Sequence, residues 1–392
     1  MSRFHDSTMR FRWSGPAAIA VAVLVAGAAT GCAQRPTSDP GAAAVSPANA
    51  TTGTAPSPSS TPTPSSAPLG CDDLVPKGEI VQALAAGQRA DDWVVVPATT
   101  VDGTITGVQA LKGAGGLSCS WKAGPANAGA GAGVPTLTVS ILPGAADQWT
   151  GALYGDSPTP QRRTFAGISA AATCGDPGCG ATAAVGSSWV RVDLFTGSRE
   201  GSPSAFAKQT DDQVFADVRP AVEAVFRTVQ HASAADLRFP DHLPTGGTAP
   251  CTNFLKKVPL ADLLDVKSTS IDTHFRPDPK IDSLFGAAEQ RIGDSVCIVE
   301  DPQYSMAVEL ASVTTAPEQA WAVDDIAEHP AEHGYLHETQ LKGLQSGERA
   351  LTSCSATRTQ CTVLFTLGST AIQIDDAKHA ERVAEAIIAV AR

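Results

Sequence analysis

The chain has 392 residues and a formal net charge of −12, and 43% of its residues are hydrophobic. Because domains average roughly 100–200 residues, this length predicts two domains with buried cores once an N-terminal tail is set aside. The acidic balance argues against a nucleic-acid partner, since phosphate binding needs clustered lysine and arginine and no segment carries a basic stripe.

Residues 1–32 have the pattern of an export signal. Three arginines fall within the first twelve residues, and an apolar run over residues 17–29 is too short to span a bilayer comfortably. The run ends in Ala-Thr-Gly-Cys at residues 29–32, which resembles a bacterial lipobox, in which the cysteine is lipidated after the signal is cut. Ala29 departs from the leucine usual at that position.

Cys32 is therefore the expected lipidation site, with a plain secretory signal and an incidental cysteine as the alternative. Lipidation is favoured because the other eight cysteines fall into a repeated pattern, and an unpaired thiol is a liability on an exported protein. We expect the protein to be anchored by lipid to the cell membrane, on its extracytoplasmic face. Residues 33–70, almost wholly Ala, Pro, Ser, Thr and Gly, predict a disordered tether.

The eight remaining cysteines form two ladders of four, offset by about 180 residues. The rungs are Cys71, Cys119, Cys174 and Cys179, then Cys251, Cys297, Cys354 and Cys361. After the fourth rung, residues 179–187 align without a gap onto residues 361–369, and both segments end in Gly-Ser between alternating apolar residues, which predicts a β-hairpin. The repeat predicts two related domains, at residues 71–230 and 251–392, joined by a linker at residues 231–250.

The order of the predicted elements is similar in the two domains. In the first we expect helices at residues 77–86, 145–154 (around Trp149) and 212–229, and strands at residues 93–96, 117–121, 136–142 and 163–171 before the hairpin. In the second we expect helices at residues 254–264, 318–328 (around Trp321) and 380–390, and strands at residues 295–300, 305–313, 362–367 and 371–375. The fold class is α+β, with an antiparallel sheet covered by helices in each domain.

Spacing alone leaves the disulfide pairing open, because four cysteines in one domain allow three connectivities. The simplest choice gives each domain two disulfides: Cys71–Cys119 and Cys174–Cys179 in the first, Cys251–Cys297 and Cys354–Cys361 in the second. Zinc is the alternative for each set of four. Disulfides are favoured because no C-x-x-C pair occurs and an exported protein meets an oxidising compartment.

Both ladders open with Cys-x-x-[Leu/Phe]-[Val/Leu], and the second rung of the first ladder stands in Cys119-Ser120-Trp121. On these motifs the domains resemble disulfide-bonded α+β domains of actinobacterial envelope lipoproteins of unknown function, and more distantly the extracellular sensor domain of PknH-type receptor kinases. The second ladder departs from the motif, with Cys297-Ile298-Val299. The resemblance implies a cell-surface module that binds or senses a ligand, and it supplies no catalytic residues.

One string formally matches a zinc motif. His329-Pro-Ala-Glu332-His333 has the H-x-x-E-H pattern, in which two histidines bind zinc beside a catalytic glutamate on a helix. Pro330 and Gly334 interrupt helices, so a solvated loop is the expected structure here. The chain contains no G-x-S-x-G, P-loop or dinucleotide-binding glycine motif, and we expect no cofactor.

Other conspicuous residues have ordinary structural explanations. The acidic pairs Asp72/Asp73, Asp211/Asp212, Asp324/Asp325 and Asp375/Asp376 are expected at helix starts or on helices, where negative charge is favourable. Trp149 and Trp321 are expected to be core or interface anchors.

The leading functional hypothesis is a non-enzymatic, membrane-tethered tandem module that binds or senses an unknown envelope ligand or protein. A groove between its two domains is one candidate place for that ligand. The alternatives are a metal-dependent hydrolase using His329, Glu332 and His333, and a structural scaffold of the envelope.

Overall fold

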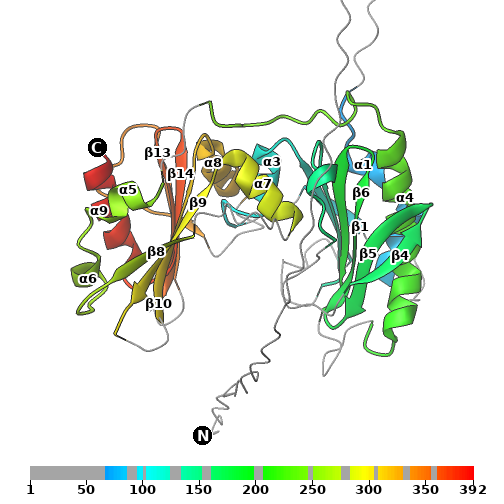
Figure 1. Cartoon of the computed structure of the whole chain (residues 1–392), viewed down its shortest axis with the longest axis horizontal. Coiled ribbons are helices and arrows are strands. Elements are labelled where there is room, and N and C mark those ends of the chain that lie inside the picture. Colours follow the sequence, from blue (N-terminus) through cyan, green and yellow to red (C-terminus); the bar gives the residue numbers. More distant parts are fainter. Residues whose placement is uncertain are drawn as a thin grey trace, which may run out of the picture. The chain divides into compact units, whose positions relative to one another are not determined.

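Two seven-stranded antiparallel sheets carry the fold of this computed structural model (Figure 1). The structure describes residues 67–85, 95–99, 103–123, 134–151, 160–197, 206–245, 250–274, 283–303, 308–329, 336–354 and 360–392. Residues 63–392 form one unit. The predicted signal segment, Cys32 and the predicted tether as far as residue 66 lie outside the described residues. Within the described part, no helix is long and apolar enough to cross a membrane.

The first sheet has the strand order β1-β2-β3-β7-β6-β5-β4, with every neighbouring pair antiparallel. Its strands are β1 (Val95–Thr99), β2 (Leu117–Ala123), β3 (Thr136–Leu142), β4 (Gln161–Phe165), β5 (Ile168–Gly175), β6 (Gly178–Val185) and β7 (Ser188–Phe195).

The second sheet, counted from its β8 edge, has the order β8-β9-β10-β14-β13-β12-β11. Its strands are β8 (Ser270–His274), β9 (Ser295–Asp301), β10 (Val308–Ala316), β11 (His337–Glu338), β12 (Ala350–Cys354), β13 (Cys361–Leu367) and β14 (Thr370–Ala377). Numbered in chain order within each sheet, the seven strands therefore stand in the same spatial order in both. The predicted α+β class with antiparallel sheets is confirmed.

One face of each sheet is covered by helices and forms a core. The helices are α1 (Cys71–Leu74), α2 (Lys77–Ala85) and α4 (Asp211–His231) on the first sheet, and α5 (Thr252–Leu255), α6 (Leu260–Leu263) and α9 (Ala380–Ala391) on the second. Helix α4 begins at a capping box, in which the Thr210 side chain accepts from the Gln213 N–H and the Gln213 side chain accepts from the Thr210 N–H. Its apolar stripe, including Val218 and Val225, is buried against the first sheet. Figure 1 shows α4 lying along this sheet.

A third cluster of buried side chains joins the two halves. Helix α3 (Val108–Gly113) of the first half packs against α7 (Leu284–Ile292) of the second, and α8 (Ala320–Glu328) completes the cluster. Leu111, Trp189, Ile292, Val323 and Leu364 are all 2% exposed or less there. These apolar side chains fill the contact between the halves, so it is packed like a core.

Some predictions of local structure were wrong. The helix predicted at residues 254–264 is two four-residue helices, α5 and α6. Residues 145–151 contain only a 3-10 turn, η2 (Ala146–Gln148), in place of the predicted helix, and Gly151 follows at φ 81°. Residues 163–171 belong to a hairpin, β4–β5, because Ala166 and Gly167 both adopt positive φ as a type I′ turn requires. Helices α3 and α7 were not predicted at all.

Candidate functional site

Eight cysteines of the described residues are joined as four disulfide pairs. Two pairs join the start of each half to its second strand: Cys71–Cys119 and Cys251–Cys297. The other two, Cys174–Cys179 and Cys354–Cys361, join directly opposed residues of neighbouring strands.

A hollow of about 360 Å³ lies beside Cys179, at the end of β5, β6 and β7. The register sets Thr173, Gly180 and Asp193 side by side across the three strands, with Gly175, Gly178 and Phe195 in the next row. Side chains alternate between faces along a strand, so these positions share the face opposite the α4 core. Three of the six positions are glycine, so backbone atoms form the floor of the hollow there.

The carboxylate of Asp193 is held in the hollow by a buried cation. Arg191 Nε donates to Asp193 Oδ2 at 2.6 Å, and Arg191 is only 4% exposed. The Arg191 guanidinium lies 5.5 Å from the ring centroid of Phe285, which α7 of the second half supplies. A charged hydrogen bond between a buried arginine and a carboxylate fixes the direction in which the acid points.

A row of buried polar side chains crosses the sheet next to the hollow, beginning with the strand neighbours of Arg191. Thr182, Arg191, Ser140 and Ser118 are successive cross-strand neighbours on β6, β7, β3 and β2, and all are buried. Trp189 Nε1 donates to Thr182 Oγ1 at 2.7 Å, so the hydroxyl nearest Arg191 on β6 is fixed as well. The side chains that flank Asp193 on this face of the sheet are therefore polar.

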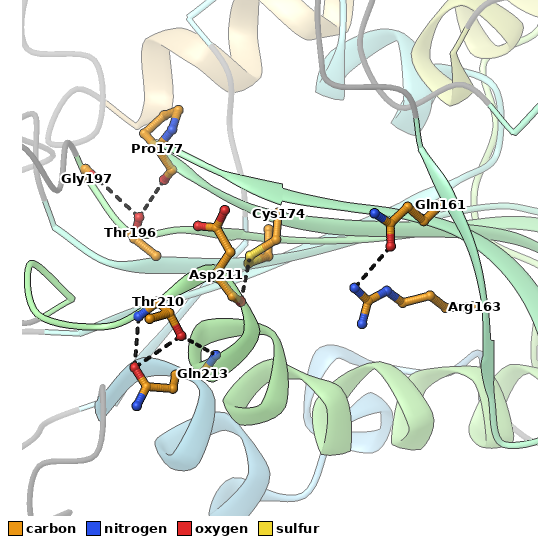
Figure 2. Close-up of a disulfide and its surroundings, with 10 residues drawn as sticks. Gln161, Arg163, Cys174, Pro177, Thr196, Gly197, Thr210, Asp211 and Gln213 are labelled. Atoms are coloured by element: carbon orange, nitrogen blue, oxygen red, sulfur yellow. Dashed lines mark hydrogen bonds between the residues drawn. A yellow bond between two sulfur atoms is a disulfide. The ribbon is translucent and has the colours of Figure 1, made fainter.

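The outer rim is formed by Phe195 and the β5–β6 turn. Phe195 is 41% exposed, one of two large apolar side chains so exposed among the described residues. Thr196 donates from its N–H and its Oγ1 to the carbonyl of Pro177, at 2.8 and 2.7 Å, and so fastens the turn to the end of β7. Figure 2 shows this bond near the Cys174 disulfide. Asp176 stands on the same turn and lines the hollow.

A second hollow, of about 420 Å³, lies beside Cys174 at the start of α4. Arg163 stands over the ring of Phe215 at 4.2 Å and donates to Gln161 Oε1 at 3.3 Å. Cys174 Sγ lies 3.2 Å from the carbonyl oxygen of Asp211 (Figure 2). The polar groups here are joined to one another at the helix cap, which is a structural role.

The second sheet closes the equivalent position with side chains. Asp375 follows Cys361 by 14 residues, as Asp193 follows Cys179. It accepts from Thr362 Oγ1 at 3.0 Å and from Gln373 Nε2 at 2.6 Å. Where β13 has Thr362, β6 has Gly180. In addition, β14 carries a bulge, since Cys361 faces Ala377 while the residue two further along β13 faces Ile374.

The zinc-motif residues do not form a described site. His329 caps the end of α8, with Nδ1 2.7 Å from the carbonyl oxygen of Asp325. Glu332 and His333 lie outside the described residues. In the part of the chain that the structure describes, no three His, Cys, Asp or Glu side chains are grouped so as to hold a metal ion.

The other residues singled out from the sequence lie mostly where they were predicted. Trp149 and Trp321 pack against the cluster between the halves, and Trp321 stacks on His242 with ring centroids 4.5 Å apart. Three of the acidic pairs stand on helices α1, α4 and α8. The prediction for Asp375/Asp376 was wrong, because both residues are in strand β14.

No family model matches the chain, and no curated protein or solved structure does so either. Sequence reasoning missed the hollow itself. The available signal was three glycines within six residues of a strand hairpin, since glycine inside a strand often marks a place where something approaches the backbone closely.

Proposed function

We propose that the protein is a lipid-anchored, extracytoplasmic and non-enzymatic module that binds a small ligand of the cell envelope. The observation that carries this proposal is the arrangement of the nine cysteines as four pairs and one single residue. Eight stand in four pairs at bonding distance, as expected in an oxidising compartment, and the ninth is Cys32, directly after a signal-like segment. The resemblance of the ladders to envelope lipoproteins supports the same location.

We also propose that the two halves arose by duplication of one domain. The shared spatial order of seven strands and the matching positions of two cysteine pairs in each half support this. The halves then differ in one place of functional interest: the first has the glycine-floored hollow at Asp193, and the second has Thr362 against Asp375.

The hollow beside Cys179 is the ligand site in this proposal. A rigid carboxylate, a threonine hydroxyl and an exposed aromatic ring surround a volume suited to a small molecule. The groove between the halves is a weaker choice, because apolar side chains such as Leu111 and Ile292 already pack that contact.

Membrane attachment is tested by comparing the native chain with Cys32→Ala in a lipoprotein-producing bacterium. The native chain should partition into the detergent phase, and its N-terminal peptide should carry a diacylglyceryl group by mass spectrometry. Cys32→Ala should move to the aqueous phase or stay uncleaved. An unmodified Cys32 thiol on the mature native chain would overturn the anchor.

A further inference from the structure

We propose that Cys174 is a modification site, at which a small thiol enters the second hollow and forms a mixed disulfide with the Cys174 sulfur. Cys179 is the leaving group of this exchange. The inference goes beyond the proposed ligand binding. It starts from a difference among the disulfides in how easily a reagent can reach them.

Access to sulfur differs among the disulfides. Cys251 and Cys297 are both 0% exposed, so their bond is closed to reagents while the protein is folded. Cys354 is exposed at the surface. Cys174 is half-buried and lines the hollow of about 420 Å³ at the start of α4. Because exchange requires a thiolate to reach a sulfur atom, this hollow gives a small thiol a route to Cys174.

Cys174 is the sulfur that lies at this hollow. Its Sγ is 3.2 Å from the carbonyl oxygen of Asp211, which also lines the hollow, as Figure 2 shows. Cys179 is 4% exposed, and it is not among the described residues that line the same hollow. A thiolate bonds to the sulfur that it reaches, and the other sulfur leaves. The mixed disulfide therefore forms on Cys174.

The walls of the hollow set the size of the thiol. Gln161 and Arg163 of β4 form one side, and the first turn of α4 forms the other. Arg163 lies 4.2 Å from the ring centroid of Phe215 and donates to Gln161 Oε1 at 3.3 Å, so this wall is held in place. The volume is in the range of pockets that bind small molecules. A thiol with a small organic body therefore fits.

The exchange conserves atoms and electrons. The thiolate forms a sulfur–sulfur bond to Cys174 while the bond from Cys174 to Cys179 breaks. The electron pair of the broken bond leaves on Cys179, which takes up the proton that the incoming thiol has lost. One disulfide is lost and one is formed, so no further oxidant or reductant is needed.

The hairpin that carries this disulfide has other connections. The pairing of β5 with β6 continues on both sides of Cys174 and Cys179, and Thr196 fastens the turn through two hydrogen bonds to the Pro177 carbonyl oxygen. Exchange is therefore compatible with a folded sheet. Cys179 also lines the hollow proposed for the ligand, so a free thiol there would change the wall of that site.

The test uses the full-length chain in a neutral detergent and 2-mercaptoethanol as the small thiol. Free thiols are first blocked with N-ethylmaleimide, which is then removed. After brief exposure to limiting 2-mercaptoethanol, iodoacetamide traps the released thiols, and peptide mass spectrometry locates both groups. Cys174 should carry the mercaptoethanol and Cys179 the carbamidomethyl group, while Cys251–Cys297 stays closed.

Two tryptophan variants test the route to the sulfur. Gln161→Trp places a large ring at the hollow and should slow the opening of Cys174–Cys179 about tenfold. Arg162→Trp is the matched control: Arg162 lies over Trp149, and successive side chains of β4 point to opposite faces. The control should open at the native rate. Circular dichroism checks that both variants are folded.

Each contrary outcome would overturn a stated part of the inference. A Cys174–Cys179 bond that stays closed, in a sample where the exposed Cys354–Cys361 bond opens, would overturn the modification site. Mercaptoethanol on Cys179 would overturn the choice of the attacked sulfur. Equal rates for Gln161→Trp and the native chain would overturn the route through the hollow. If Cys251–Cys297 opens in step, exchange follows unfolding, and the proposal is overturned as well.

Discussion

Gly178 is the residue on which the shape of the hollow depends most directly. An added methyl group would meet backbone, the Leu194 carbonyl oxygen at 2.1 Å, and a strand paired on both sides cannot easily move away. We therefore expect Gly178→Ala to lower the free energy of unfolding by about 1–3 kcal/mol, as overpacking does.

Gly78 in α2 is the matched control for this change. Nothing lies within 4 Å of a Cβ added there, and alanine is the better helix former, so Gly78→Ala should raise the free energy of unfolding by up to about 1 kcal/mol. Urea unfolding of the two variants measures both effects. Equal and small changes would mean that the close approach at Gly178 is easily relieved.

At the residue scale, the sequence shows which residue types are present and how they are spaced. It does not show which of them lie side by side in the fold. Several features are visible as sequence patterns: the cysteine ladders, the lipobox-like segment, and the equal spacing of Asp193 and Asp375 from a preceding cysteine. The hollow is not, because it depends on the register that sets Gly180 between Thr173 and Asp193. A shift of one residue would place these side chains on the opposite face.

At the scale of elements, the contact of α3 with α7 and α8 combines apolar packing with hydrogen bonds and an ion pair. Asp325 of α8 accepts from Gln109 Nε2 at 2.9 Å and from Lys112 Nζ at 3.0 Å, both on α3. Glu289 and Gln373 accept from backbone N–H groups of Gly107 and Ile105, at 3.2 and 2.9 Å. These bonds satisfy groups that the packing has removed from water.

Asp325 should make stability depend on pH. Burial opposes its charged form, but the hydrogen bonds from Gln109 and Lys112 and the charge of Lys112 outweigh burial and lower its pKa. A lowered folded pKa means that the acid stabilises the fold above its unfolded pKa of about 3.9, and that this stabilisation is lost as the pH falls through the folded value.

Asp325→Asn should therefore lower the free energy of unfolding at pH 7 by about 1–3 kcal/mol, and its difference from the native chain should shrink below about pH 4. Urea unfolding at pH 7, 4 and 2.5 measures this. Asp324→Asn is the control on the neighbouring residue: its contact with Arg349 is half exposed, so the change should stay below about 1 kcal/mol. A difference in the free energy of unfolding that stays constant across the pH series would contradict a stabilising charge on Asp325.

The two kinds of cysteine pair should contribute unequally. Cys71–Cys119 closes 48 residues and Cys174–Cys179 closes 5. On the chain-entropy relation these loops are worth about 4 and about 2 kcal/mol respectively. Double alanine variants of each pair, unfolded in urea without reductant, should show the larger loss for Cys71–Cys119. The reverse order would mean that packing outweighs loop closure.

Long amphipathic elements were predictable, and short ones were not. Helix α4 was expected at residues 212–229 and occupies Asp211–His231, because its apolar stripe repeats over five turns. Helix α7 was missed although Ser283 caps it and Gly293 ends it with φ 69°, since nine residues give a weak periodicity. The contact of α3 with α7 had no signal in either segment alone.

At the scale of the whole molecule, the cluster shared by the halves should couple their unfolding. Leu111 of α3 is fully buried there. Leu111→Ala should cost about 2–5 kcal/mol through the cavity it leaves. Because the cluster includes Trp189 of β7 and Leu364 of β13, hydrogen exchange should speed up in β13 as well as in β7.

Leu243→Ala is the control, since Leu243 is 40% exposed and its loss should change stability by less than about 0.5 kcal/mol. Faster exchange confined to the first sheet in Leu111→Ala would show that the halves unfold separately.

The ladder spacing predicts two halves with a similar order of elements, but it does not predict how the halves meet. The linker was predicted to be irregular. Within it, the backbone of His242 donates its N–H to the Gly113 carbonyl oxygen at 2.8 Å and its carbonyl oxygen accepts from Gln319 Nε2 at 2.7 Å. These bonds join segments more than 75 residues apart, beyond the range of local sequence patterns.

The first described residues of the chain also have a mechanical consequence. The N–H of Leu69 donates to the Asp236 carbonyl oxygen at 2.8 Å, and two residues later Cys71 is bonded to Cys119 in β2. In a lipid-anchored protein, tension arriving from the membrane would pass through this sulfur bridge into a strand with partners on both sides. Force on the tether would thus be shared by the hydrogen-bonded strands of the sheet. It would not separate α1 from the sheet by itself.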